Sequence, residues 1–262
     1  MIELALVTGA SSGIGKELCR LLARQGINLI ISGRNIVELQ ALSDELSLLV
    51  PVIIAPADIA NIQDRLGLVE LIHKRMPDLV INNAGFGLYG DALSHRIRDT
   101  MEILEVDGNA TIQLTLEAAR TLIDAKKRGI ILNVASVAGY FEIFPSLAMY
   151  AAAKAMVAQF SQSLDDEIER HGVRVLTACP GMVNTGFRDR AAGKHLEEKV
   201  FGTMDAIFAA EQIWKQIQSG KAVNIFDWKY KVAVFCARYL VPRRWVAKIL
   251  KRGINKRLAD KG

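Results

Sequence analysis

Short apolar runs alternate with longer amphipathic stretches along this chain of 262 residues. The apolar runs are rich in β-branched residues and are bounded by turn residues, which is typical of buried parallel strands. They occupy residues 4–7, 28–32, 52–55, 79–82, 129–134, 173–178 and 222–226. Helical spacing fills residues 13–25, 35–48, 62–75, 98–127, 149–171 and 206–219. The alternation predicts βαβ units in a single-domain α/β fold with one doubly wound, Rossmann-like parallel sheet.

Composition narrows the class of protein. Hydrophobic residues make up 51% of the chain and charged residues 23%, so a sizeable core can form. There is no uncharged apolar run of about 18 residues and no secretory signal, which predicts neither a membrane span nor export. Three widely spaced cysteines, Cys19, Cys179 and Cys236, suit a reducing cytoplasm. They form no metal-ligand pair and the four histidines are scattered, so we expect no metal.

The basic charge is concentrated at the C-terminus. Residues 228–262 hold eleven Lys and Arg and one acid, Asp260, a net charge of +10. The whole chain carries +5, which leaves −5 for residues 1–227. Nucleic-acid-binding enzymes more often spread basic surface over the body, so we expect no nucleic-acid partner. We predict a cofactor-binding catalytic domain over residues 1–227 and a basic amphipathic tail over 228–262.

A glycine-rich segment follows the first predicted strand. Residues 8–15 read TGASSGIG and lead into a helix. Such a strand–turn–helix unit aims backbone N–H groups and a helix N-terminus at a pyrophosphate. Three glycines alone are a weak signal, and their place after the first strand strengthens it. The predicted contacts come from Thr8, Gly9, Ser11, Ser12, Gly13, Ile14 and Gly15.

The end of the second predicted strand bears on cofactor choice. An NAD-binding enzyme usually has an acid here to bind the ribose 2′-OH, but this chain has Gly33 followed by Arg34. A guanidinium suits a 2′-phosphate. The pattern therefore favours NADP(H) over NAD(H), unless Arg34 is only a solvated surface residue.

Residues 8–15 resemble the cofactor motif of the short-chain dehydrogenase/reductase family. Three further motifs follow in that family's order over residues 1–226: NNAG at 82–85, YxxxK at 150–154 and PGxxxT at 180–185. The resemblance implies seven strands in the order 3-2-1-4-5-6-7 and a homodimer or homotetramer. It also implies that Asp58 contacts the adenine. The other implied cofactor contacts are Ile59, Asn83, Ala84, Gly85, Tyr150, Lys154, Pro180, Gly181, Val183 and Thr185.

Tyr150 and Lys154 lie four residues apart on a predicted helix and so share a face. An ordinary tyrosine has a pKa of about 10, which a nearby ammonium lowers. The resemblance implies that Tyr150 protonates the substrate oxygen during hydride transfer, that Lys154 also holds the nicotinamide ribose, and that Ser136 bonds the same oxygen. The alternative is a packed core tyrosine beside a lysine whose ammonium reaches solvent.

The sequence departs from the family pattern at two points. Asp107 aligns with the usual catalytic Asn, and Asn109 would fit only after a slip of two residues. A carboxylate at that place would stabilise the Lys154 cation and oppose a lowered pKa for Tyr150. The interval from Ser136 to Tyr150 is also one residue longer than usual, which places an extra residue in the loop 140–147.

Apolar segments at 86–89 and 140–147 should lie at the carboxyl ends of strands, where ligands bind in open α/β sheets. They favour a lipophilic ketone, aldehyde or secondary alcohol as the substrate, although ordinary loop packing explains them equally well. Residues 186–205 resemble a mobile substrate lid. We therefore expect an NADP(H)-dependent oxidoreductase. The alternative is a non-enzymatic NADP(H)-binding sensor or scaffold at a membrane surface.

The tail carries two apolar stripes among its basic residues. A basic amphipathic helix flanked by Trp228 and Trp245 is typical of an element on an anionic membrane, which would make the protein peripheral on the cytoplasmic face. Packing against the body or a partner subunit, with the basic face solvated, is an equally good interpretation. A helix opening at Pro242 carries Val246, Ile249, Leu250, Ile254 and Leu258. The stretch before it carries Val232, Phe235, Cys236, Tyr239 and Leu240.

Overall fold

The computed structural model describes residues 2–193 and 203–259. Seven strands form one parallel sheet in the order β3-β2-β1-β4-β5-β6-β9. The predicted order is confirmed, and the last strand is β9 because β7 (Val183–Asn184) and β8 (Met204–Asp205) pair separately. The seven strands are β1 (Leu4–Thr8), β2 (Asn28–Gly33), β3 (Val52–Pro56), β4 (Leu79–Asn82), β5 (Gly129–Val134), β6 (Val173–Cys179) and β9 (Val223–Ile225).

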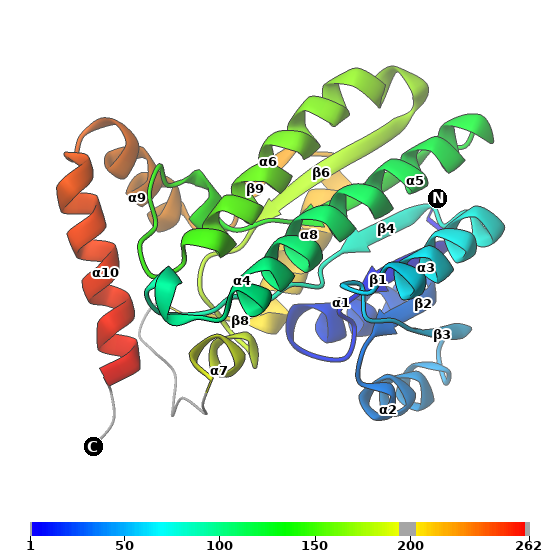
Figure 1. The fold of residues 1–262 in the computed structure, drawn as a ribbon. Helices are drawn as coiled ribbons and strands as arrows, with labels where there is room; N and C mark the ends of the chain where they lie inside the picture. Colours follow the sequence, from blue (N-terminus) through cyan, green and yellow to red (C-terminus); the bar gives the residue numbers. More distant parts are fainter. Residues whose placement is uncertain (1, 194–202, 260–262) are drawn as a thin grey trace.

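Helices cover both faces of the sheet (Figure 1). One face packs against α1 (Gly13–Arg24), α2 (Ile36–Leu46) and α8 (Ala206–Ser219), and the other against α3 (Ile62–Arg75), α5 (Thr111–Asp124) and α6 (Ala148–Ile168). Successive strand residues point to opposite faces, so Val7 joins the first layer and Leu6 the second, both fully buried. Three short 3₁₀ turns complete the body: η1 (Ala92–Ser94), η3 (Val137–Tyr140) and η4 (Glu169–His171).

The single helix predicted over residues 98–127 is interrupted. It consists of α4 (Ile97–Leu104), the π-helical turn η2 (Glu105–Ala110) and α5. A π-helical turn takes in an extra residue and often marks a functional site. Here it carries Asp107, whose exposed fraction is 0%, into the interior.

A buried polar network joins the ends of β4 and β5 to two helices. The Asn82 side chain donates to Asn133 Oδ1 (2.8 Å) and to Thr115 Oγ1 (3.1 Å). The Asn133 amide in turn donates to Ser161 Oγ on α6 (2.8 Å). Because buried polar groups are costly unless they are paired, this network fixes α6 relative to the strand ends.

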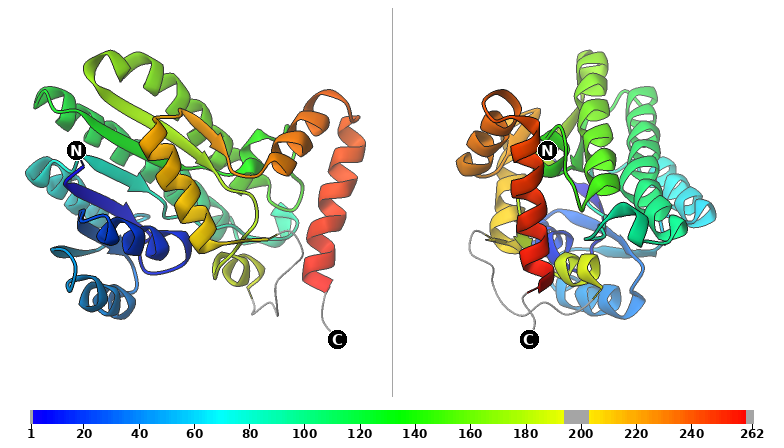
Figure 2. Two further views of the ribbon diagram at one scale, coloured as in Figure 1. Left: turned by 180° about the vertical axis from the view of Figure 1, so that it is seen from behind. Right: turned by 60° about the vertical axis from the view of Figure 1, so that its left-hand side comes forward.

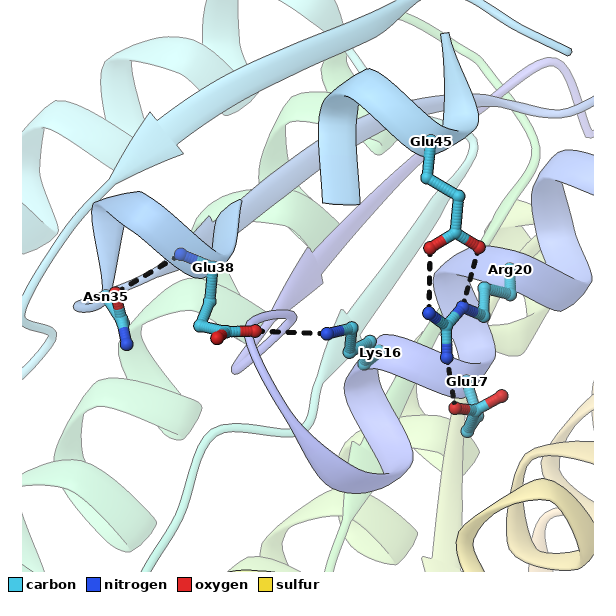
Figure 3. A network of polar contacts seen from close by, with 6 residues as sticks. All are labelled: Lys16, Glu17, Arg20, Asn35, Glu38 and Glu45. Atoms are coloured by element: carbon cyan, nitrogen blue, oxygen red, sulfur yellow. Dashed lines mark hydrogen bonds and ion pairs between the residues drawn. The ribbon is translucent and has the colours of Figure 1, made fainter. Parts of the chain in front are cut away.

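Ion pairs hold α2 against α1 beside the end of β2 (Figure 3). Lys16 Nζ lies 3.0 Å from Glu38 Oε2, and Arg20 contacts both carboxylate oxygens of Glu45 at 2.8 and 2.7 Å. The Asn35 side chain caps α2 by accepting from the Glu38 N–H (3.2 Å). These contacts position the turn that carries Arg34.

Two C-terminal helices, α9 (Trp228–Tyr239) and α10 (Arg243–Ala259), follow each other across a turn at one end of the molecule (Figure 2). α10 begins directly after Pro242, close to the predicted start. The side chains of Val234 on α9 and of Val246 and Ile254 on α10 are buried. Among the described helices, none has the length and apolarity needed to cross a membrane.

Candidate active site

A cavity of about 490 Å³ lies at the carboxyl ends of the strands. The structure brings every predicted site residue except Gly15 to its wall; Gly15 lies within the first turn of α1, below the glycine loop. The predicted residues that line the cavity are Thr8, Gly9, Ser11, Ser12, Gly13, Ile14, Arg34, Asp58, Ile59, Asn83, Ala84, Gly85, Asp107, Ser136, Tyr150, Lys154, Pro180, Gly181, Val183 and Thr185.

The glycine loop forms a cradle that fits a dinucleotide pyrophosphate. Gly9 has φ +67°, and a Cβ there would lie 2.8 Å from the Ala84 Cα, so the turn requires glycine. The Thr8 hydroxyl accepts the Asn83 and Ala84 N–H groups at 3.0 and 3.2 Å, which ties this loop to the end of β4. α1 begins at Gly13 and has no acid in its first turn, so its N-terminal dipole remains available to an anion.

The predicted catalytic side chains come from the end of β5 and from α6. Ser136 follows β5, and its Oγ accepts the Ala138 N–H at 3.1 Å. Lys154 is 4% exposed, and its Nζ lies 5.7 Å from the centroid of the Tyr150 ring. The same Nζ donates to the Val134 carbonyl oxygen at 2.8 Å. The hydroxyl, phenol and ammonium therefore face one cavity from adjacent elements.

Asp107 contacts the lysine directly. Its Oδ1 lies 2.8 Å from Lys154 Nζ, and its Oδ2 accepts the Phe86 N–H at 2.9 Å. Asn109 is exposed instead, and its amide donates to Glu105 Oε1 at 2.7 Å. Of the two alignments that the sequence left open, the structure places Asp107 beside Lys154.

The expected lowering of the Tyr150 pKa is not found. Burial raises the pKa of the Tyr150 phenol, and the negative charge of Asp107 raises it further, whereas a hydrogen bond with Ser136 opposes the rise. Burial also raises the pKa of the Asp107 carboxyl, against the Lys154 ammonium and the Phe86 N–H, which lower it. The charges of Lys154 and Asp107 were both expected from the sequence, but the larger effect of desolvation was not.

The loops predicted to be apolar reach the cavity in part. Phe141, Phe144 and Tyr89 line it, whereas Tyr140 packs with Cys179 below. Burial raises the pKa of the Cys179 thiol to about 12, so this cysteine is a packing residue rather than a nucleophile.

Several cavity residues were missed by the sequence argument. From α7 (Phe187–Ala192), the Phe187 ring lies 5.3 Å from the Tyr150 ring, and Arg190 also lines the cavity. Residues 194–202 of the predicted lid lie outside the described residues. From the tail, Tyr230 and Leu250 reach the cavity, and the Tyr230 hydroxyl accepts the Met182 N–H at 3.1 Å. The apolar stripe of the tail was a sequence signal for burial of Leu250, but no sequence signal pointed to Tyr230.

The two tail stripes have different surroundings. On α10, Val246 and Ile254 are buried and Ile254 packs with Tyr89 and Leu147, so this face covers the body. Ile249 on the same helix is 62% exposed. The side chain of Leu258 lies outside the described residues.

The α9 stripe remains largely on the surface. Val232, Phe235, Tyr239 and Leu240 are exposed, as are Trp228 and Trp245, and only Cys236 is half-buried. The tail therefore packs through one face and presents another. In residues 2–193 and 203–259, no three His, Cys, Asp or Glu side chains are grouped as a metal ion requires.

Comparison with known proteins places this chain in one family. Residues 3–195 match the family model described as short chain dehydrogenase. An uncharacterized oxidoreductase of Staphylococcus aureus (strain USA300) is 30% identical over 225 residues, which cover 85% of this chain and 94% of that protein. The chain belongs to the short-chain dehydrogenase/reductase family and is an oxidoreductase of that family.

Solved structures share the same fold. A short-chain dehydrogenase from Sphingobium yanoikuyae in complex with NADPH has a TM-score of 0.78 and 24% identity, covering 100% of this chain and 96% of its own. A family member from Burkholderia phymatum in complex with NAD has a TM-score of 0.77 and 22% identity, with coverage of 89% and 92%. The first similarity extends through α9 and α10.

Proposed function

We propose that the protein is an NADP(H)-dependent dehydrogenase or reductase that transfers hydride between nicotinamide and a lipophilic ketone, aldehyde or secondary alcohol. The observation that carries this proposal is the single cavity that Ser136, Tyr150 and Lys154 share with the glycine loop and Arg34. A dinucleotide bound in the glycine loop and the acid–base group Tyr150 can then act on the same substrate molecule.

The proposed chemistry assigns one task to each side chain. The bound cofactor supplies or accepts the hydride. Ser136 donates a hydrogen bond to the substrate oxygen and orients it, and Tyr150 gives that oxygen a proton in reduction or removes one in oxidation. Lys154, fixed by Asp107 and the Val134 carbonyl, holds the nicotinamide ribose.

The choice of NADP(H) rests on the turn after β2. Gly33 leaves no carboxylate to bind a ribose 2′-hydroxyl, and Arg34 lines the cavity with a guanidinium. One of the related structures binds NADPH and the other binds NAD, so the proposed preference for NADP(H) rests on the positive charge of Arg34.

The substrate class rests on the walls of the cavity. Phe141, Phe144, Leu147, Phe187 and Leu250 supply apolar surface around the Tyr150 phenol. Such walls gain free energy by covering apolar groups of a substrate and leave the carbonyl to the polar pair.

A non-enzymatic NADP(H)-binding sensor or scaffold is the second candidate, and the Asp107–Lys154 pair favours it because the charge of Asp107 hinders phenolate formation. Turnover of NADPH with a panel of ketones of increasing apolar size separates the two. The enzyme consumes NADPH in step with alcohol product, and the Tyr150→Phe variant does not. Binding of NADPH without turnover of any member would favour the sensor.

We also propose a homodimer or homotetramer, and a peripheral position on the cytoplasmic face of an anionic membrane. The support for the second proposal is the exposed apolar stripe of α9 within a sequence that has no acid between residues 228 and 259. Two copies of so basic a face would repel each other in a two-fold contact, so a lipid surface is favoured as the partner of this face and the subunit contacts would lie elsewhere.

A further inference from the structure

Two arginines from distant parts of the chain meet at one carboxylate oxygen. Arg34, after β2, and Arg190, on α7, each place a guanidinium nitrogen 3.7 Å from Glu102 Oε1 on α4. Arg34 also lies 3.9 Å from Asp58 Oδ2. Arg34 and Arg190 both line the cavity, so the cluster stands at its edge.

Arg190 is held in place by its surroundings. Its guanidinium carbon lies 3.8 Å from the centroid of the buried Phe86 ring, a stacked cation–π contact. The next residue, Ala191, is 2% exposed, and its carbonyl accepts the Tyr89 N–H at 2.7 Å. The backbone and the ring therefore direct this side chain toward Arg34.

Two like charges brought together need an anion between them. Burial lowers the pKa of Arg190, and the neighbouring Arg34 charge lowers it further, while Glu102, Asp107 and Asp58 oppose the shift. Glu102 offers a single oxygen at 3.7 Å to each arginine, which is longer than a hydrogen bond. The two guanidinium groups thus keep donors that a larger anion could use.

We infer that Arg190 is a second arginine for the 2′-phosphate of NADP(H), and that Glu102 pairs with both arginines until this phosphate binds. The inference rests on the proposed NADP(H) preference. A phosphate carries more negative charge than a carboxylate and has three acceptor oxygens, so it can accept from both guanidinium groups at once. NAD(H) has a hydroxyl at this position and leaves the Arg34–Glu102–Arg190 cluster undisturbed.

The space beside Arg34 fits this assignment. A Cβ at Gly33 would lie 3.1 Å from Ser11 Oγ, tighter than most Cβ contacts, so a side chain there would crowd the glycine loop. Glycine at position 33 leaves space beside Arg34 for the phosphate. Because α7 also carries Phe187 beside Tyr150, an anion bound at Arg190 would fix the aromatic wall next to the proton donor.

Equilibrium binding to the full chain tests the inference without turnover. Adenosine 2′,5′-bisphosphate and adenosine 5′-monophosphate differ at the 2′ position, and titration calorimetry measures both, with NADPH and NADH alongside. We expect Arg190→Gln to weaken the bisphosphate and NADPH on the order of 10- to 100-fold, as for loss of a charged hydrogen bond, and to leave the other two within about twofold. Glu102→Gln should tighten the bisphosphate because its competitor for the arginines is neutral.

A matched control and the wild type make the outcomes distinct. Arg96→Gln, next to the start of α4 and outside the cavity, should change none of the four affinities. An Arg190→Gln variant that loses all four ligands equally, or none of them, overturns the role of Arg190 while the NADP(H) preference of the wild type stands. A wild type that binds NADPH and NADH equally rejects the cofactor proposal itself.

Discussion

Lys154 Nζ lies 2.8 Å from Asp107 Oδ1, and the two side chains are 5% and 0% exposed. A buried ion pair gives little net stability, but loss of one partner is costly because it leaves the other charge unpaired. The pair therefore makes the proposed catalytic lysine depend on a residue of the π-helical turn η2. Its electrostatic effect falls on Tyr150, whose pKa Asp107 raises.

Asp107→Asn should move the pH profile to lower pH. Where Asp107 is ionised, its charge opposes the phenolate, so the neutral amide lets the pKa of Tyr150 fall from its raised position. Alcohol oxidation needs the phenolate, so its rise with increasing pH should begin at a lower pH than in the wild type. Carbonyl reduction needs the phenol, so its fall with increasing pH should also begin at a lower pH. We expect an unchanged or higher oxidation rate near neutrality, measured as kcat/KM against pH for both directions.

Asn109→Asp makes the reverse exchange at the exposed position two residues away, and this added charge should leave the profile in place. A large loss of rate in Asp107→Asn at every pH would show that the carboxylate itself is required. A profile that does not move would show that burial alone sets the pKa of Tyr150.

Tyr150→Phe should remove the acid–base group without removing the cofactor site. General acid–base catalysis contributes about 10²- to 10⁴-fold, and we expect a rate loss in this range with NADPH affinity kept within a few-fold. Stopped-flow rates and fluorescence titration of NADPH measure the two quantities. Tyr140→Phe, whose hydroxyl bonds to Gln162 outside the cavity, should retain the rate. A substantial residual rate in Tyr150→Phe would point to another proton donor.

Ile254→Ala should release α10 from the body. The side chain is 1% exposed against Tyr89, Leu147 and Ala191, and such a truncation costs about 2–5 kcal/mol. Urea denaturation followed by the intrinsic fluorescence of the three tryptophans, which include Trp245 on α10, measures the loss. Ile249→Ala makes the same chemical change at a 62% exposed position and should stay within about 0.5 kcal/mol. Equal effects at the two positions would mean that α10 does not pack through this face.

The outer face of α9 should bind anionic vesicles. Each engaged Lys or Arg contributes about 1 kcal/mol, and this part of the binding weakens as salt screens it. Phe235→Ser, at a 55% exposed position, should reduce sedimentation with phosphatidylserine vesicles, and Val37→Ser, 77% exposed on α2, should not. Equal pelleting with neutral vesicles, or after deletion of residues 228–262, would reject the proposal. Binding to RNA but not to vesicles would reassign the face to a nucleic acid.

The sequence by itself determined the sheet and the glycine loop. Strands such as 28–32 show as short β-branched runs, and the turn at Gly9 is set by residues next to it in the chain. These signals are local, because side-chain periodicity and turn chemistry act over a few residues. The YxxxK spacing likewise placed Tyr150 and Lys154 on one helix face before any tertiary contact was known.

Only the tertiary structure decided which neighbours these residues have. The sequence favoured Asp107 over Asn109 by alignment alone, and only the structure shows that the π-helical turn carries Asp107 into the interior beside Lys154. The sequence could not show that Tyr230 reaches the cavity, or that Arg34 and Arg190 share Glu102. It also missed the raised pKa of Tyr150. Desolvation and long-range contacts depend on how distant segments pack, and no local pattern encodes that packing.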